Sequence, residues 1–176
     1  MQSILAAMLG LLAFAVTTDR AASADPFLEL DLIRPSKLLA APDFTAPRAG
    51  GGEVRLGEER GKVIFLNFWA TWCPPCKEEM PSMERLYRRF KARKFTILAI
   101  SIDTPNGGRV AKFARELGLT FPIGLDPGLE IANRYNLRGL PVSFLIDPSG
   151  RIAAIALGAR DWDTRAAHAA IEAMLQ

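Results

Sequence analysis

Two stretches of the chain, Val63–Trp69 and Phe95–Ile102, are almost continuously apolar and rich in strand-forming residues. This pattern is typical of strands that are buried on both faces of a sheet, and Asn67 is the one amide that interrupts the first of them. Further strands are predicted over Phe121–Leu125, Val142–Ile146 and Arg151–Leu157, the last two joined by an Asp-Pro-Ser-Gly turn.

Helical spacing of apolar residues appears between these strands. The first helix is expected soon after Trp69, with Pro74 and Pro75 in its first turn, where a missing N–H costs little, and Pro81 in its interior, where it should bend the axis. Three further helices are predicted around Val110–Leu117, over Leu129–Tyr135, and near the carboxyl end with Trp162, Ala166, Ala170 and Met174 on one face. Strands that alternate with helices and end in a hairpin indicate an α/β three-layer sandwich with a mixed central sheet flanked by helices.

The first 24 residues have the character of a targeting segment. Residues 4–16 form an apolar run shorter than the roughly 20 residues needed to cross a bilayer. Ala22-Ser23-Ala24 follows with the small-x-small pattern of a cleavage site. We predict that residues 1–24 are an export signal, while the lack of a basic residue in Met1-Gln2-Ser3 keeps a retained membrane anchor open.

The segments that follow the export signal differ from the rest of the chain. Residues 25–40 mix apolar and charged positions without a clean period, so we expect a loosely attached lead segment. Residues 41–61, which contain three consecutive glycines, indicate an extended arm and a small hairpin. They open the main domain, which we assign to residues 41–176.

The length, composition and net charge of the chain are typical of one globular domain with a hydrophobic core. The chain has 176 residues, 49% of them hydrophobic, and a formal net charge of +3. Its basic cluster falls where a helix should end, where cations are favoured by the helix dipole and by solvation. This cluster comprises Arg88, Arg89, Lys91, Arg93 and Lys94. The charge gives no reason to expect a nucleic-acid partner, and we predict a monomer.

Cys73 and Cys76 are the only cysteines of the chain. A disulfide closing so small a ring would restrain the unfolded chain by roughly 2 kcal/mol, less than longer loops supply, so stapling is a poor reason for its position. At a helix start the first sulfur lies over unpaired N–H groups and the positive end of the dipole, which lowers the pKa of the Cys73 thiol. We predict that Cys73 attacks a disulfide and that Cys76, one turn deeper, resolves the mixed disulfide.

Metal binding is the main alternative function for two cysteines at the spacing of Cys73 and Cys76. Half of a zinc site would need further Cys or His ligands, and His168 is the single histidine. We expect His168 to be a surface residue, and we predict neither a metal centre nor another cofactor. Two soft thiolates also suit Cu(I), so a copper chaperone stays open as a non-enzymatic alternative.

The segment Gly61–Pro81, with its Cys-Pro-Pro-Cys centre, resembles the TlpA/ResA/CcmG group of exported thioredoxin-like proteins. Ala41–Phe44 is similar to the start of the wider redoxin (AhpC/TSA) and peroxiredoxin superfamily, and Gly139–Asp147 to its later proline loop. The resemblance spans roughly residues 41–175 and implies a thioredoxin-like fold with a hairpin extension at its amino end.

The resemblance also implies a substrate-binding rim. A cis peptide bond is expected before Pro141, facing the cysteine pair, although trans is the default for an X-Pro bond. Leu140 would then offer its backbone groups to an extended substrate segment. Trp72, directly before Cys73, is expected to contact the same segment.

The route of the Cys76 proton differs from that in thioredoxins proper, which carry a buried aspartate where this chain has Asn67. Another group must therefore accept the proton. Glu79 matches the position of an acid in the ResA-like group, and partial burial would raise the pKa of its carboxyl into a range suited to proton transfer. A solvated acid favoured by the helix start is the alternative for Glu79.

The function that these features predict is that of a periplasmic thiol:disulfide oxidoreductase that reduces protein disulfides. Pro75 removes the N–H two residues past Cys73, so fewer donors stabilise the thiolate and the centre should be reducing. Family-typical substrates are apocytochrome c or copper-site proteins, with a membrane thiol carrier as electron donor. A thiol peroxidase is the alternative enzyme, although Ala70 stands where the peroxiredoxin pattern has Thr three residues before its cysteine.

Overall fold

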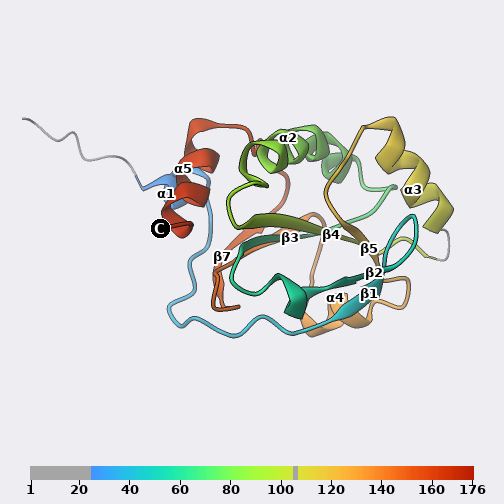
Figure 1. The fold of residues 1–176 in the computed structure, drawn as a ribbon, viewed down its shortest axis with the longest axis horizontal. Helices are drawn as coiled ribbons and strands as arrows, with labels where there is room; N and C mark the ends of the chain where they lie inside the picture. The colour runs from blue at the N-terminus through green and yellow to red at the C-terminus, as the bar shows by residue number, and fades with distance from the viewer. Residues whose placement is uncertain (1–24, 105–106) are drawn as a thin grey trace, which may run out of the picture.

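A five-stranded mixed sheet, in the order β5-β4-β3-β6-β7, forms the middle layer of the protein (Figure 1). The computed structural model describes residues 25–104 and 107–176, so the export signal or anchor predicted for residues 1–24 lies outside the described residues. The strands are β3 (Val63–Trp69), β4 (Phe95–Ser101), β5 (Ile123–Leu125), β6 (Val142–Ile146) and β7 (Ile152–Leu157). The predicted α/β three-layer sandwich is confirmed.

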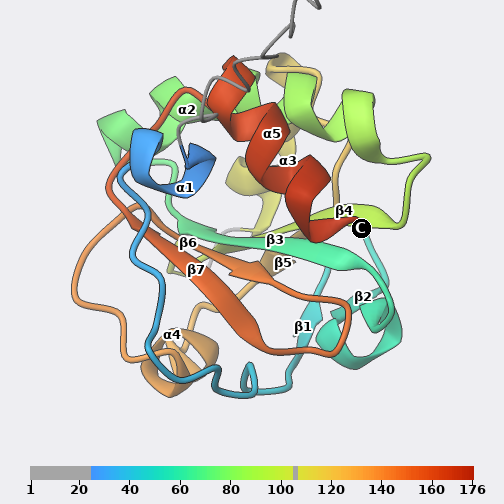
Figure 2. The same cartoon turned by 90° about the vertical axis from the view of Figure 1, so that its left-hand side faces the viewer.

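Helices cover both faces of the sheet, as Figure 2 shows. One face carries α1 (Pro26–Glu29), α2 (Pro74–Phe90), α3 (Gly107–Glu116) and α5 (Arg165–Met174), whereas α4 (Glu130–Arg134) lies on the other. None of the helices among the described residues has the length and apolar composition needed to cross a bilayer.

Strand β3 is the centre of the sheet and divides the core. It pairs in parallel with β4 and antiparallel with β6, and every one of its residues is buried. Because side chains alternate along a strand, Val63, Phe65 and Trp69 pack in the cluster under α2. Ile64, Leu66 and Phe68 pack on the opposite face of the sheet. By this alternation Asn67 faces α2, together with the cysteines at the start of that helix.

The final helix begins later than predicted. Helix α5 starts at Arg165, and Trp162 precedes it, although its side chain is fully buried in the same core. The Thr164 side chain caps the helix by accepting a hydrogen bond from the N–H of Ala167 at 3.1 Å. Placing Trp162 on a helix face was therefore wrong, because the cap residue lies two positions beyond Trp162 and the helix starts three positions beyond it.

Residues 27–32 of the lead segment are packed against the core, so the expectation of loose attachment was wrong for this part, whereas residues 33–40 are mostly exposed. Phe27, Leu30 and Leu32 are buried in the core cluster, and α1 packs against α5. Arg160 holds this segment from outside the core: its Nε donates to the Leu30 carbonyl at 2.8 Å and its Nη2 to the Asp31 carbonyl at 3.1 Å. Three apolar side chains in a short stretch thus attach this part of the segment to the core.

The arm and hairpin predicted for residues 41–61 are present. Strands β1 (Thr45–Pro47) and β2 (Glu53–Arg55) pair antiparallel, and a short 3₁₀ helix, η1 (Leu56–Glu59), follows. Segments from the amino-terminal part of the chain also meet both edges of the main sheet. Ile33 exchanges backbone hydrogen bonds with Ile155 of β7, and the Ala49 N–H donates to the Ile123 carbonyl of β5.

Replacing Phe27 tests whether the lead segment is part of the folding unit. Phe27→Ala removes a side chain that is 9% exposed and should lower the free energy of unfolding in urea by about 3 kcal/mol. Leu28→Ala is the matched control, because Leu28 is 73% exposed, and its effect should stay within about 0.5 kcal/mol. Equal effects of the two substitutions would contradict the packing described for α1.

Candidate functional site

The two cysteines form a disulfide at the start of α2. Cys73 is the N-cap residue, and Cys76 lies in the first turn of the helix. The Cys73 Sγ atom accepts a hydrogen bond from the Cys76 N–H at 3.3 Å. Pro74 and Pro75 occupy the first two helical positions and have no N–H. The Cys76 N–H is therefore the one N–H of the first turn that the structure directs at the Cys73 sulfur.

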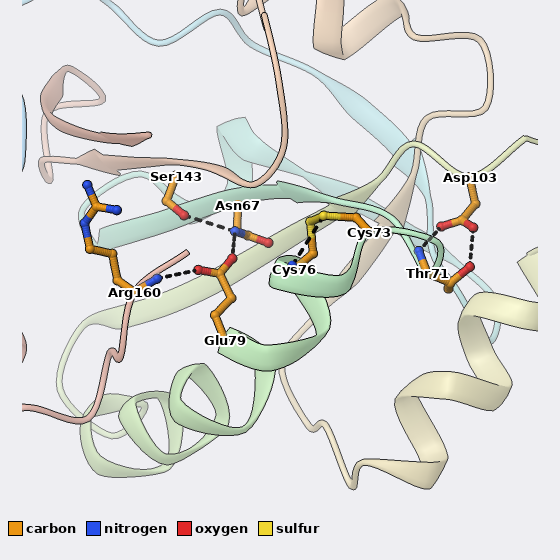
Figure 3. The surroundings of a disulfide bond; sticks show 8 residues. All are labelled: Asn67, Thr71, Cys73, Cys76, Glu79, Asp103, Ser143 and Arg160. Carbon is orange, nitrogen blue, oxygen red and sulfur yellow. Dashed lines mark hydrogen bonds between the residues drawn. A yellow bond between two sulfur atoms is a disulfide. The ribbon is translucent and has the colours of Figure 1, made fainter. Parts of the chain in front are cut away.

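The loop before Cys73 is held by a buried carboxylate. Asp103, just past the end of β4, accepts hydrogen bonds through Oδ2 from the Thr71 N–H at 2.8 Å and from Ser101 Oγ at 2.7 Å, and through Oδ1 from the Thr71 hydroxyl. Figure 3 shows Asp103 and Thr71 beside the disulfide, on the side away from Glu79. These bonds fix the backbone that presents Cys73. No sequence motif marks Asp103 for this role.

The residues expected to bind substrate gather around Cys73. Trp72, Cys73 and Leu140 line one open apolar cavity of about 460 Å³, and the Trp72 side chain is 61% exposed at its rim. The peptide bond between Leu140 and Pro141 is cis, as predicted. Pro141 lines an adjoining apolar cavity together with Leu140 and Leu157. The fold therefore brings an exposed aromatic ring, a reactive sulfur and the proline loop to one surface.

Glu79 is buried on the other side of the disulfide, with only 2% of its surface exposed. Its Oε1 accepts from Asn67 Nδ2 at 2.9 Å, and its Oε2 accepts from Trp162 Nε1 at 3.1 Å and from the Arg160 N–H at 3.3 Å (Figure 3). Desolvation by burial outweighs these three hydrogen bonds and raises the pKa of Glu79 to about 7. The alternative of a solvated acid is excluded by this burial.

Two partners of this network have no signal in the local sequence. Arg160 joins Glu79 through its backbone N–H while its guanidinium binds carbonyl groups of the lead segment. Ser143 of β6 lies directly opposite Asn67 in the sheet and accepts its second Nδ2 hydrogen bond at 3.0 Å. Each contact joins residues more than 70 positions apart, so only strand register could have pointed to Ser143.

His168 lies in α5, away from the cysteines, and is half-buried rather than on the open surface. Its Nε2 lies 2.9 Å from Asp163 Oδ1, and its ring packs edge-on against Phe90. The expectation of a surface residue was wrong because α5 packs this face toward α2. Among the residues that the structure describes, no three His, Cys, Asp or Glu side chains are grouped so as to hold a metal ion.

Exchange between thiols and disulfides is the chemistry that this arrangement supports. Together with the fold, it places the protein among the thioredoxin-like thiol:disulfide oxidoreductases. The comparison with protein families agrees: the chain belongs to the AhpC/TSA family, whose model matches residues 39–155.

Individual relatives agree with this class. The thiol-disulfide oxidoreductase ResA of Geobacillus kaustophilus is 47% identical over 118 residues, which are 67% of each chain. A thiol:disulfide interchange protein of Chlorobium tepidum superposes with a TM-score of 0.70 at 27% identity, covering 81% of this chain and 99% of that one. A thiol-disulfide oxidoreductase of Bacteroides fragilis superposes with a TM-score of 0.65 at 28% identity, covering 77% of this chain and 98% of that one. The predicted resemblance to ResA-like proteins is confirmed.

The raised pKa of Glu79 predicts a pH-dependent stability. With a folded pKa of about 7 against an ordinary 4.5, the folded protein holds a proton that the unfolded chain releases between these values. This contribution to the free energy of unfolding is full below pH 4.5 and falls by about 3 kcal/mol as the pH rises through 7. In urea titrations of the oxidised protein from pH 4.5 to 8, Glu79→Gln should remove that fall.

Glu78→Gln is the matched control, because Glu78 is exposed on the same helix turn and lies outside the network. It should keep the slope of the unaltered protein. If Glu79→Gln also kept that slope, the carboxyl would not be titrating near pH 7.

Proposed function

We propose that this protein is an exported reductase of protein disulfides that acts in the periplasm. The observation that carries the proposal is the position of Cys73 Sγ at the start of α2, beside an apolar surface and facing a single N–H donor. A thiolate with few donors is stabilised modestly, which favours the disulfide form of the pair and hence electron donation.

The two cysteines would act in sequence. The Cys73 thiolate attacks one sulfur of a substrate disulfide, forming a mixed disulfide and releasing the other sulfur as a thiolate. Cys76, which is fully buried, then attacks Cys73 Sγ, so that the substrate leaves as a dithiol and the enzyme keeps the disulfide. Two electrons pass to the substrate in each cycle, and a membrane thiol carrier would return them.

Glu79 is proposed to accept the proton of Cys76 during the second step. It follows Cys76 by three residues on α2, so both lie on one helix face, and a carboxyl with a pKa of about 7 can take up and release a proton near neutral pH. Trp72, Leu140 and Pro141 are proposed to bind the substrate segment around its cysteine. This assignment is supported by the cavity that Trp72 and Leu140 line together with Cys73, and by the adjoining cavity that Pro141 lines with Leu140.

Export and substrate identity rest on the sequence and its relatives. The apolar run and small-x-small site in residues 1–24 support export, followed either by cleavage near Ala24 or by tethering to the inner membrane. We propose cysteine pairs of apocytochrome c or of copper-site proteins as substrates, as the resemblance to the TlpA/ResA/CcmG group implies.

A thiol peroxidase is the second candidate, because the matched family is named AhpC/TSA. The site gives this activity little support. Ala70 occupies the position three residues before Cys73 and has no hydroxyl, and the hydroxyl of the next residue, Thr71, is bonded to Asp103. Peroxide consumption by the reduced protein at a rate comparable to disulfide reduction would favour this candidate.

Trapping tests the assigned order of the cysteines. Cys76→Ser should leave Cys73 able to attack but unable to release its partner, so mixed disulfides should accumulate in cells and identify substrates by mass spectrometry. Cys73→Ser is the matched control and should accumulate few adducts, because Cys76 is fully buried. Adducts that form mainly on Cys76 would reverse the assignment.

The reduction potential tests the direction of electron flow. In glutathione and dithiothreitol buffers, the Cys73–Cys76 pair should equilibrate nearer to thioredoxin, at about −270 mV, than to DsbA, at about −120 mV. A potential near that of DsbA would contradict the proposed reductase role while leaving the exchange chemistry intact.

A further inference from the structure

The side-chain amide of Asn67 has an unpaired polar atom in the protein core. Asn67 is fully buried in β3, and its Nδ2 donates to Glu79 Oε1 and to Ser143 Oγ. Within the part of the chain that the structure describes, Asn67 Oδ1 has no hydrogen-bond partner. A buried acceptor left unsatisfied costs about 1–3 kcal/mol, so its retention calls for a physical reason.

The orientation of this amide is fixed by its neighbours. In its ionised form the Glu79 carboxylate only accepts hydrogen bonds, so the Asn67 nitrogen, which donates to it, faces Glu79 and the amide oxygen points the other way. Figure 3 shows that Asn67 Oδ1 points toward the disulfide. Asn67 lies on the same face of β3 as Phe65, which packs in one apolar cluster with Cys73 and Cys76. The unpaired oxygen therefore faces sulfur instead of water.

The sulfurs can satisfy this oxygen in only one redox state. A disulfide carries no proton and donates no hydrogen bond, whereas a thiol S–H is a weak donor. We propose that Asn67 Oδ1 accepts a hydrogen bond from the Cys76 thiol in the reduced protein and is left unpaired when the disulfide forms. Asn67 is thus a positioning residue that favours the dithiol state, whichever way electrons flow.

Of the two cysteines, we assign Cys76 as the donor to Asn67 Oδ1, because Cys73 has a different environment. Cys73 Sγ accepts the Cys76 N–H and lies at the rim of the open cavity, as suits a thiolate. Cys76 is fully buried among apolar groups, where a neutral thiol is favoured and an acceptor is needed. Through Nδ2, the same amide also binds Glu79, so it connects the buried thiol to the buried carboxyl.

The redox equilibrium with glutathione measures this preference. Asn67→Leu keeps the size of the side chain and removes the acceptor, so the equilibrium should shift about tenfold toward the disulfide, which is about 30 mV for two electrons. Ser143→Ala is the matched control: it removes a partner of Nδ2 in both redox states equally and should change the equilibrium less than twofold. An equally small shift in Asn67→Leu would overturn the proposal.

The hydrogen bond itself has a spectroscopic signature. In Cys73→Ala the thiol of Cys76 is the only S–H group of the chain, and its infrared stretching band should lie at lower frequency than when Asn67→Leu is added. Asn67→Ala, which adds no bulk, is a second variant for the comparison. Identical bands with and without the Asn67 amide would overturn the proposal, even if the redox equilibrium had shifted.

Discussion

The first turn of α2 is fixed between an apolar cluster and one buried carboxylate, and the arrangement of the site follows from this double attachment. Cys76, in the first turn of α2, packs in the same core cluster as Phe65 of β3. Glu79, in the next helix turn, is held by N–H donors from β3 and from the segment before α5. Apolar packing sets the distance between helix and strand, and the directional hydrogen bonds of Glu79 set the rotation of the helix about its axis.

Burial of an acid at this position has an energetic cost that the surroundings reduce only in part. Three N–H donors face its two oxygens, yet desolvation still dominates and raises the pKa of Glu79. The guanidinium of Arg160 does not form an ion pair with this acid, because it is occupied by carbonyl groups of Leu30 and other residues. The protein therefore keeps a carboxyl group close to its titration midpoint at neutral pH, where proton uptake and release are both accessible.

Features that depend on neighbouring residues could be predicted from the sequence, and features that depend on distant contacts could not. The apolar runs fix β3 and β4, and the spacing of the cysteines identifies the redox centre without any tertiary information. The cis bond before Pro141 required the family resemblance, since trans is the default for an isolated X-Pro pair. The role of Arg160 and the packing of the lead segment arise from contacts across about 130 positions, which no local pattern records.

The backbone pairing of the amino-terminal segments has a consequence for aggregation. An exposed edge strand is a template for pairing with another chain. Here Ile33 occupies the hydrogen-bonding groups of Ile155 on one edge of the sheet, and Ala49 bonds to Ile123 on the other. These bonds obstruct strand addition at both edges. A second copy could therefore extend the sheet only after displacing these segments, so the amino-terminal part of the chain protects the sheet from self-association.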